Sequence, residues 1–230
     1  MSTTQNSTET FFRSRFFKGL SQEELAPVAE ICQRKHIKAG ATLVHQNDPA
    51  QYVYTVLSGT LMLERTSNAG RRQVIGFSFS GDFVGITNST EYDYSVVCLQ
   101  EALIQAFPRK RFLELVDSNP KLKENARNTG RNIHAQALDQ LFALGQKKSH
   151  ERLCFFINQI SQRQPGTDRD DIKLIMNRQD IADYLGLTIE TVSRGFAKLK
   201  KDGVISIEST HRVKILDQEA LEEMASSSAR

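Results

Sequence analysis

The pattern of hydrophobic and polar positions divides the chain into three parts. From residue 34 to about residue 107, short alternating runs framed by glycine predict strands with no helix between them. Residues 110 to about 144 change to apolar spacings of three and four, which are typical of a helix. Beyond residue 146, short helical segments lead to a final pair of strands. We therefore predict an α+β protein with an N-terminal antiparallel jelly-roll, a long helix and a C-terminal winged helix-turn-helix.

The same pattern sets the domain boundaries that we expect. Residues 1–10 are polar and are expected to be disordered. The roll is placed at residues 11–115, the long helix at 116–145 and the winged helix-turn-helix at 146–217. Residues 218–230 form a tail, acidic and then rich in serine and alanine, expected to hold a last short helix. Within the roll we expect residues 52–64 to form a strand pair broken at Ser58 and Gly59. The wing should consist of two strands, at residues 204–207 and 212–216.

Residues 176–201 carry the clearest local signals. Asn177 and Asp180 have the spacing of a helix-capping box, and Gly186 stands where a helix ends in a left-handed residue. Thr188 can cap a second helix. The apolar stripe of that helix is Val192, Phe196 and Leu199. An ordinary amphipathic hairpin of helices would share this pattern, but a polar first turn with lysines behind it fits the major groove of DNA.

Residues 180–194 resemble the DNA-binding helices of the CRP/FNR family of bacterial transcription regulators. The motif Glu190-x-x-Ser193-Arg194 is most similar to the FNR and FixK branches. Upstream, the order Lys-x-Gly, Asp-Pro-Ala, Val-x-x-Gly and Gly-Asp-Phe-x-Gly over residues 38–85 looks like the cyclic-nucleotide-binding roll of the same family. The resemblance thus covers about residues 11–216.

The resemblance implies how double-stranded DNA is read. Arg194 can donate to O6 and N7 of a guanine, and Glu190 can accept from a cytosine amino group. Ser193 suits contact with thymine, and Ile189 stands where the CRP branch carries an arginine. These residues favour the half-site TTGAT over TGTGA, in a palindrome TTGAT-N4-ATCAA. Glu190 and Arg194 can also simply pair with each other at i, i+4.

Several polar residues around the two helices are candidates for phosphate contact, although each of the lysines also suits a solvated surface. The net charge of the chain is only +3, but residues 177–214 are clearly basic. The candidates are Arg178, Gln179, Thr188, Lys198, Lys200, Lys201 and His211.

A stripe of small and apolar residues along the long helix suggests close packing of two helices. The stripe consists of Ala126, Gly130, Ile133, Ala137, Leu141 and Leu144. In the family this helix forms a homodimer, which a palindromic site also needs. Packing of the stripe on the chain's own roll is the alternative. The resemblance further implies contact with RNA polymerase, and the predicted hairpin at residues 67–72 is a candidate for it.

The residues disfavour the family's known effectors. Cyclic-AMP-binding members place a glutamate after the Gly-Asp-Phe-x-Gly motif and an Arg-Ser pair later. Here Ile86 takes the first position, and Tyr92 and Asp93 take the pair's place, so cyclic AMP is not expected. FNR holds an iron–sulfur cluster on N-terminal cysteines, but residues 1–31 contain none, so a cluster is not expected either. Haem binding is kept as an alternative, because histidine is a haem ligand and the chain contains His36, His45, His134 and His150.

Of the three cysteines, Cys98 and Cys154 are candidates for a redox-sensitive thiol, and burial as small hydrophobes is the alternative. No apolar run approaches the roughly 18 residues of a membrane span, and no signal peptide is visible. No catalytic triad, phosphate loop or metal cluster indicates an enzyme.

The sequence therefore predicts a cytoplasmic homodimer without cofactor, most consistent with an activator in anaerobic, microaerobic or nitrogen-related gene control. One alternative is a member whose roll binds another small molecule. A redox- or haem-dependent member is the other.

Overall fold

The computed structural model describes residues 14–164 and 169–226. The predicted disordered segment 1–10 lies outside these residues, as do the last four positions of the tail. Contacts divide the described chain into two compact units, one of residues 14–70 with 75–134 and the other of residues 71–74 with 135–226.

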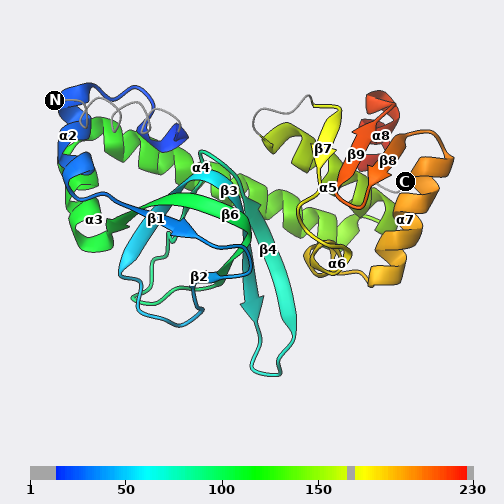
Figure 1. The fold of residues 1–230 in the computed structure, drawn as a ribbon, viewed down its shortest axis with the longest axis horizontal. Helices are drawn as coiled ribbons and strands as arrows, with labels where there is room; N and C mark the ends of the chain where they lie inside the picture. Colours follow the sequence, from blue (N-terminus) through cyan, green and yellow to red (C-terminus); the bar gives the residue numbers. More distant parts are fainter. Residues whose placement is uncertain (1–13, 165–168, 227–230) are drawn as a thin grey trace. The chain divides into compact units, whose positions relative to one another are not determined.

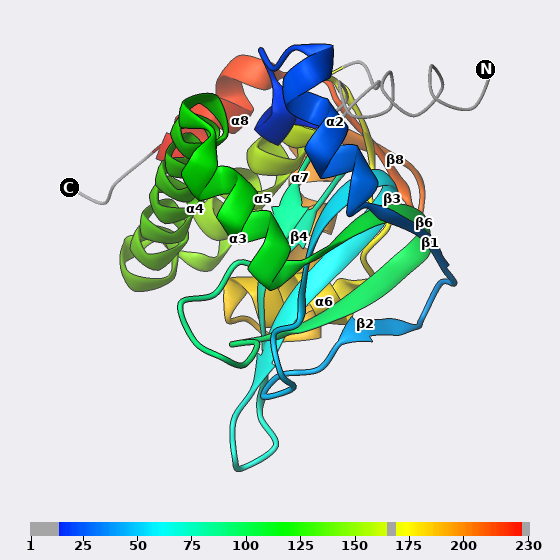
Figure 2. The ribbon, with the colours of Figure 1, turned by 90° about the vertical axis from the view of Figure 1, so that its left-hand side faces the viewer.

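The first unit is built on an antiparallel sheet, as the fold class predicted. Its main order is β1(Gln33–Ile37), β6(Ser95–Pro108), β3(Tyr52–Thr66) and β4(Arg72–Ser78). Two shorter strands join it, β2(Thr42–Val44) on β6 and β5(Phe83–Val84) on β3. The long strands β3 and β6 run side by side and antiparallel, pairing Tyr52 with Pro108 at one end and Glu64 with Ser95 at the other (Figure 2).

The predicted break at Ser58 and Gly59 is wrong. Strand β3 continues through both residues, and the register with β6 shifts there instead of ending in a turn. Gly59 has φ +97°, and a Cβ on it would lie 2.6 Å from Cβ of Ala102. Glycine is therefore used for a bulge and a close approach to β6, not for a chain reversal.

Short helices close one end of this sheet. They are η1(Arg15–Phe17), α2(Gln22–Glu30) and α3(Arg109–Ser118). An aromatic cluster forms the core beneath them, with Phe16, Phe17, Phe83, Phe107 and Phe112 all buried. Helix α2 begins with the capping box of Ser21 and Glu24.

The helical region after the roll is two helices, not one. Helix α3 ends at Ser118, and α4(Pro120–Gln146) starts two residues later. The side chain of Asn119 accepts from the amides of Lys121 and Leu122, and Pro120 suits a first helical position. The predicted boundary at residue 116 thus falls inside α3, and the long helix runs from Pro120 to Gln146.

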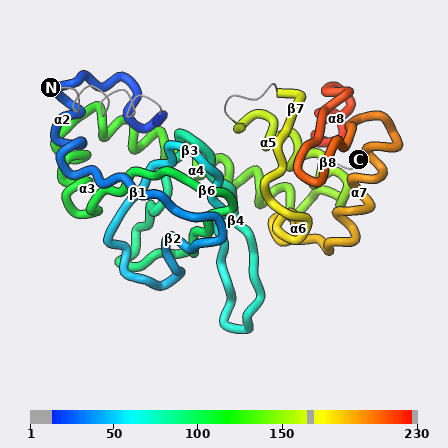
Figure 3. Tube along the Cα trace, in the orientation of Figure 1, coloured from blue at the N-terminus to red at the C-terminus, as the bar shows by residue number. Residues whose placement is uncertain are grey.

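In the second unit, helices pack around a small sheet (Figures 1 and 3). In order they are α5(Ser149–Arg163), α6(Arg178–Leu185), α7(Ile189–Lys201) and α8(Gln218–Ser226). The predicted two-stranded wing, β8(Ile205–Ser209) with β9(Arg212–Ile215), gains a third strand, β7(Asp171–Lys173). Arg212 pairs with the carboxylate of Asp171 at 2.6 Å and holds this segment against β9.

Candidate nucleic-acid interface

Helices α6 and α7 meet in the tight turn that the sequence predicts. The side chain of Asn177 accepts from the amide of Asp180 at 2.9 Å, and the carboxylate of Asp180 accepts from the amide of Asn177 at 3.1 Å. Helix α6 ends at Gly186, which has the left-handed φ of +61°. Thr188 then caps α7 by accepting from the amide of Thr191 at 3.2 Å. Local signals alone therefore fix where both helices begin and where the first one ends.

Helix α7 presents one face to its own domain and the other to solvent. Its inner stripe of Val192, Phe196 and Leu199 is buried, as predicted. The residues assigned to base reading are all exposed in its first half: Ile189, Glu190, Ser193 and Arg194. These side chains thus share the accessible surface that a groove-reading helix requires.

The charged side chains of Glu190 and Arg194 lie close enough to interact, and both stay exposed to solvent. The pKa of Glu190 is lowered, first by a hydrogen bond from its own backbone amide, then by the Thr188 hydroxyl and the charge of Arg194. Arg194 itself donates to the hydroxyl of Thr191 at 3.5 Å. Glu190 therefore stays ionised as an acceptor, and the Arg194 guanidinium remains exposed.

The phosphate candidates separate into exposed and occupied groups. Lys200 and Lys201 are exposed at the end of α7. Arg178 instead lies on the ring of Phe196, 3.5 Å from its centroid, and burial lowers the pKa of Arg178. A nitrogen of the His211 ring lies 2.9 Å from the carbonyl oxygen of Leu174. Thr188 serves as a helix cap, and Gln179 donates to Asp183 at 2.7 Å.

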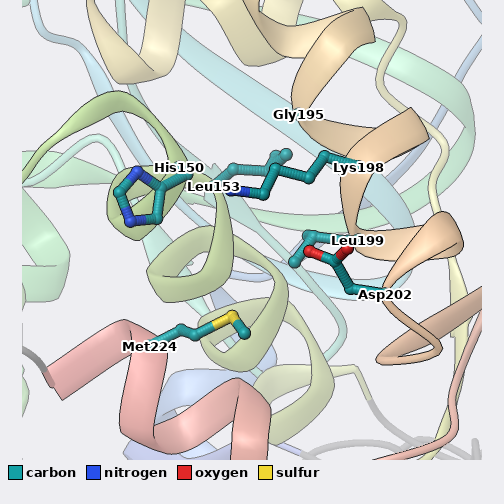
Figure 4. A pocket seen from close by; sticks show the side chains of 7 residues that line it. All are labelled: His150, Leu153, Gly195, Lys198, Leu199, Asp202 and Met224. Atoms are coloured by element: carbon teal, nitrogen blue, oxygen red, sulfur yellow. The ribbon is translucent and has the colours of Figure 1, made fainter.

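Lys198, four residues after Arg194 on α7, is exposed as well. It lines a cavity of about 120 Å³ between helices of the second unit, and its side chain extends toward Leu153 of α5 (Figure 4). The remaining lining residues are His150, Gly195, Leu199, Asp202 and Met224. All three lysines predicted on this helix are therefore exposed, and Lys198 also borders this cavity.

The predicted dimer stripe is only partly available. Ala126 packs on the core of its own roll, as the alternative interpretation had it, and Leu144 is half-buried beside Gly186. The middle of the stripe, Gly130, Ile133, Ala137 and Leu141, is exposed. Two large apolar residues that the spacing missed adjoin it. The exposed fractions are 45% for Ile133, 51% for Leu138, 67% for Leu141 and 49% for Phe142. We call Leu138, Leu141 and Phe142, which line one shallow pocket within the second unit, the α4 apolar surface.

The roll positions compared with cyclic-AMP binders are occupied by contacts within the chain. The hydroxyl of Tyr92 donates to the carbonyl of Tyr52 at 2.8 Å, and Tyr92 is buried. Asp93 accepts from the hydroxyl of Thr87 at 2.5 Å, while Ile86 is exposed. These positions thus hold an apolar group and a carboxylate in place of an anion clamp, and the nearby Arg109 guanidinium is bound to the carbonyl oxygens of Thr87 and Ser89.

Both candidate redox thiols are buried. Burial raises the pKa of Cys154 to about 11 and also raises the pKa of Cys98. Over the described residues, no cluster of three histidine, cysteine or acidic side chains is arranged to hold a metal. Within the same residues, none of the helices combines the length and apolar character needed to cross a bilayer.

Native alkylation is expected to be slow at Cys154. A pKa of about 11 rather than 9.0 leaves about 100-fold less thiolate near neutral pH, and burial restricts access further. The rate with iodoacetamide, followed by mass spectrometry, should rise about tenfold per pH unit between pH 7 and 10. The unfolded chain is the control and should react at the ordinary rate. Fast native labelling at pH 7 would contradict the burial argument and favour a redox role.

A capped helix pair with an exposed, polar reading face and an adjoining three-stranded wing defines a winged helix-turn-helix DNA-binding protein. Residues 151–224 match the Crp-like helix-turn-helix domain, and residues 34–119 match the cyclic nucleotide-binding domain. The chain belongs to the CRP/FNR family of transcription regulators, which are not enzymes.

Individual relatives support the same assignment. The chain is 33% identical over 190 residues to the nitrogen fixation regulation protein FixK of Bradyrhizobium diazoefficiens, covering 82% of this chain and 80% of that protein. It is 32% identical over 208 residues to the transcriptional activator protein FnrL of Cereibacter sphaeroides, covering 85% and 81%. The structure of FixK2 from Bradyrhizobium japonicum shares the fold, with a TM-score of 0.81 at 23% identity, over 86% of this chain and all of that one. The predicted family and fold class are thereby confirmed.

Proposed function

We propose that this chain is a homodimeric transcription activator that reads palindromes of the type TTGAT-N4-ATCAA. The observation that carries the proposal is the exposed set Glu190, Ser193 and Arg194 on the first half of a capped, well-packed α7. An arginine that can donate twice suits a guanine, and an ionised glutamate suits a cytosine amino group. Ile189, exposed at the start of α7, cannot donate to a second guanine, which supports TTGAT over TGTGA.

Dimerisation is the second part of the proposal, and the α4 apolar surface supports it. Three large apolar side chains on one stretch of helix are costly to leave in water, and a second copy of the same helix can cover them. Two copies related by a two-fold axis would present two α7 helices to the two halves of a palindrome.

The relatives' names support the physiological part. They include a transcriptional activator, a nitrogen fixation regulator and, at 29% identity, the fumarate and nitrate reduction regulatory protein of Escherichia coli. We accordingly propose a cytoplasmic activator in anaerobic, microaerobic or nitrogen-related gene control. The hairpin at residues 67–72 is our proposed contact for RNA polymerase. We further propose that the roll works without a cofactor, which the positions of Ile86, Tyr92 and Asp93 support.

Fluorescence anisotropy with aerobically purified protein and no added ligand tests the proposal. The duplexes are TTGAT-N4-ATCAA and a matched one with TGTGA half-sites. Selective binding of the first would support a regulator that needs no effector. Equal binding of both duplexes would contradict the reading assignment. Binding that appears only after adding haem or a metabolite would contradict the cofactor-free roll.

Lys201→Ala is expected to weaken binding to all sequences equally. Lys201 is exposed near the end of α7, beyond the base-reading residues, so it can contact phosphate but not bases. Losing one phosphate contact per half-site should reduce the slope of log Kd against log salt by about one per protomer. Anisotropy titrations at several salt concentrations measure the slope. An unchanged slope would show that Lys201 is a solvated surface charge.

A further inference from the structure

Helix α6 ends in carbonyl groups that its own residues cannot satisfy, as every helix does. Three side chains from outside α6 bind them, and one is Gln73, which donates to the carbonyl oxygen of Asp183. Gln140 of α4 donates to the carbonyl oxygen of Tyr184 at 2.7 Å, and Arg152 of α5 donates to that of Leu185 at 3.0 Å. All three contacts lie within the second compact unit. The end of the first reader helix is therefore bound by side chains of segments that precede it in the chain, among them the helices α4 and α5.

The Arg152 guanidinium also binds the end of α4. It donates to the carbonyl oxygen of Leu144 at 2.8 Å and to that of Lys147, just beyond α4, at 2.9 Å. One cation thus gathers three carbonyls, two of them from the negative ends of α4 and α6. The planar fork of an arginine can satisfy three separate acceptors in this way, whereas the single ammonium of a lysine cannot hold the same geometry.

Packing at the same point leaves little freedom between the two helix ends. A Cβ placed on Gly186 would lie 3.4 Å from Leu144 and 3.6 Å from the Arg152 guanidinium. The turn between α6 and α7 is therefore seated against the last turn of α4, with Arg152 between them. We call Arg152 and Gln140, with the carbonyls they bind, the carbonyl clamp.

We propose that the carbonyl clamp sets the spacing between the two half-sites that the protein accepts. The inference rests on the proposed function, in which α4 joins the two protomers. The clamp is the fixed connection between that helix and the turn from which α7 starts. Base identity is read by α7 alone, so the clamp should govern where α7 is held and not which bases it prefers. Arg152 and Gln140 are positioning residues and touch no base.

The test compares wild type with Arg152→Lys on palindromes whose TTGAT half-sites are separated by two to six base pairs. Wild type should prefer the spacing of four. In Arg152→Lys the ratio of affinities between that spacing and its neighbours should fall about tenfold, the equivalent of one lost charge-assisted hydrogen bond. Discrimination between TTGAT and TGTGA at the spacing of four should stay within about twofold of wild type. Arg131→Lys, on the exposed side of α4, is the matched control.

Each outcome decides the proposal. An unchanged spacing preference in a folded Arg152→Lys protein overturns it. An equal loss of affinity at every spacing also overturns it, because a purely structural role produces that result. If Arg152→Lys does not fold, Gln140→Met, which leaves the guanidinium in place, takes the same test. If wild type does not select TTGAT at any spacing, the proposed function fails instead.

Discussion

Leu141→Asp is expected to convert the protein to a monomer and to reduce its affinity for the palindrome by about 100-fold or more. Leu141 is 67% exposed in the single chain and lies in the middle of the α4 apolar surface, next to Leu138 and Phe142. In a symmetric dimer each carboxylate would be buried against apolar groups without a partner, which costs several kcal/mol. A monomer can hold only one half-site, so it loses the gain of binding two linked sites.

A matched substitution separates the loss of the dimer from a general effect of added charge. Leu113→Asp introduces the same carboxylate on α3, where Leu113 is 47% exposed and lies outside the α4 apolar surface. Sedimentation velocity should show a dimer for wild type and Leu113→Asp and a monomer for Leu141→Asp. Circular dichroism should be the same for all three. If Leu141→Asp remained a dimer with full affinity, the dimer surface would have to lie elsewhere.

The structure agrees with the predictions from the sequence where these rest on interactions between neighbouring residues. The caps at Asn177 and Thr188 and the left-handed Gly186 act through residues at most four positions away. The sequence alone therefore places the reader helices and their exposed residues. Such signals can be recognised in the sequence because the interacting atoms belong to residues within one helical turn of each other.

Disagreements arise where distant segments decide the outcome. Spacing along α4 could not show that the roll core covers Ala126 or that Leu144 lies beside Gly186. Gly59 looked like a turn because its contact with Ala102 involves a strand more than 40 residues away.

The contacts of Arg152 are the clearest example of a structural role that the sequence pattern does not predict. Its guanidinium donates to three backbone carbonyls. Because every residue carries a backbone carbonyl, no pattern of side chains predicts which carbonyls are bound. One signal in the sequence pointed to this role. Arg152 follows the end of a predicted helix by a few residues, and long cationic side chains often bind the last carbonyls of a helix.

Arg194→Ala is expected to remove discrimination at one guanine in each half-site. A good bidentate contact to guanine contributes about 1–3 kcal/mol of selectivity, so each half-site should lose about 5- to 150-fold. The palindrome contains the contact twice, and the two losses should add in free energy because the half-sites are well separated. The exposed guanidinium and its weak hydrogen bond to Thr191 indicate little cost to folding.

The decisive comparison uses two duplexes, TTGAT-N4-ATCAA and the same palindrome with its half-site guanines exchanged for adenines. Wild type should favour the first strongly, Arg194→Ala should bind both alike, and Lys201→Ala should keep the wild-type ratio at lower overall affinity. These outcomes differ because a base edge carries sequence information and a phosphate does not. If Arg194→Ala and Lys201→Ala both lost affinity by the same factor on both duplexes, Arg194 would be a phosphate contact. Readout would then have to rest on Glu190 and Ser193.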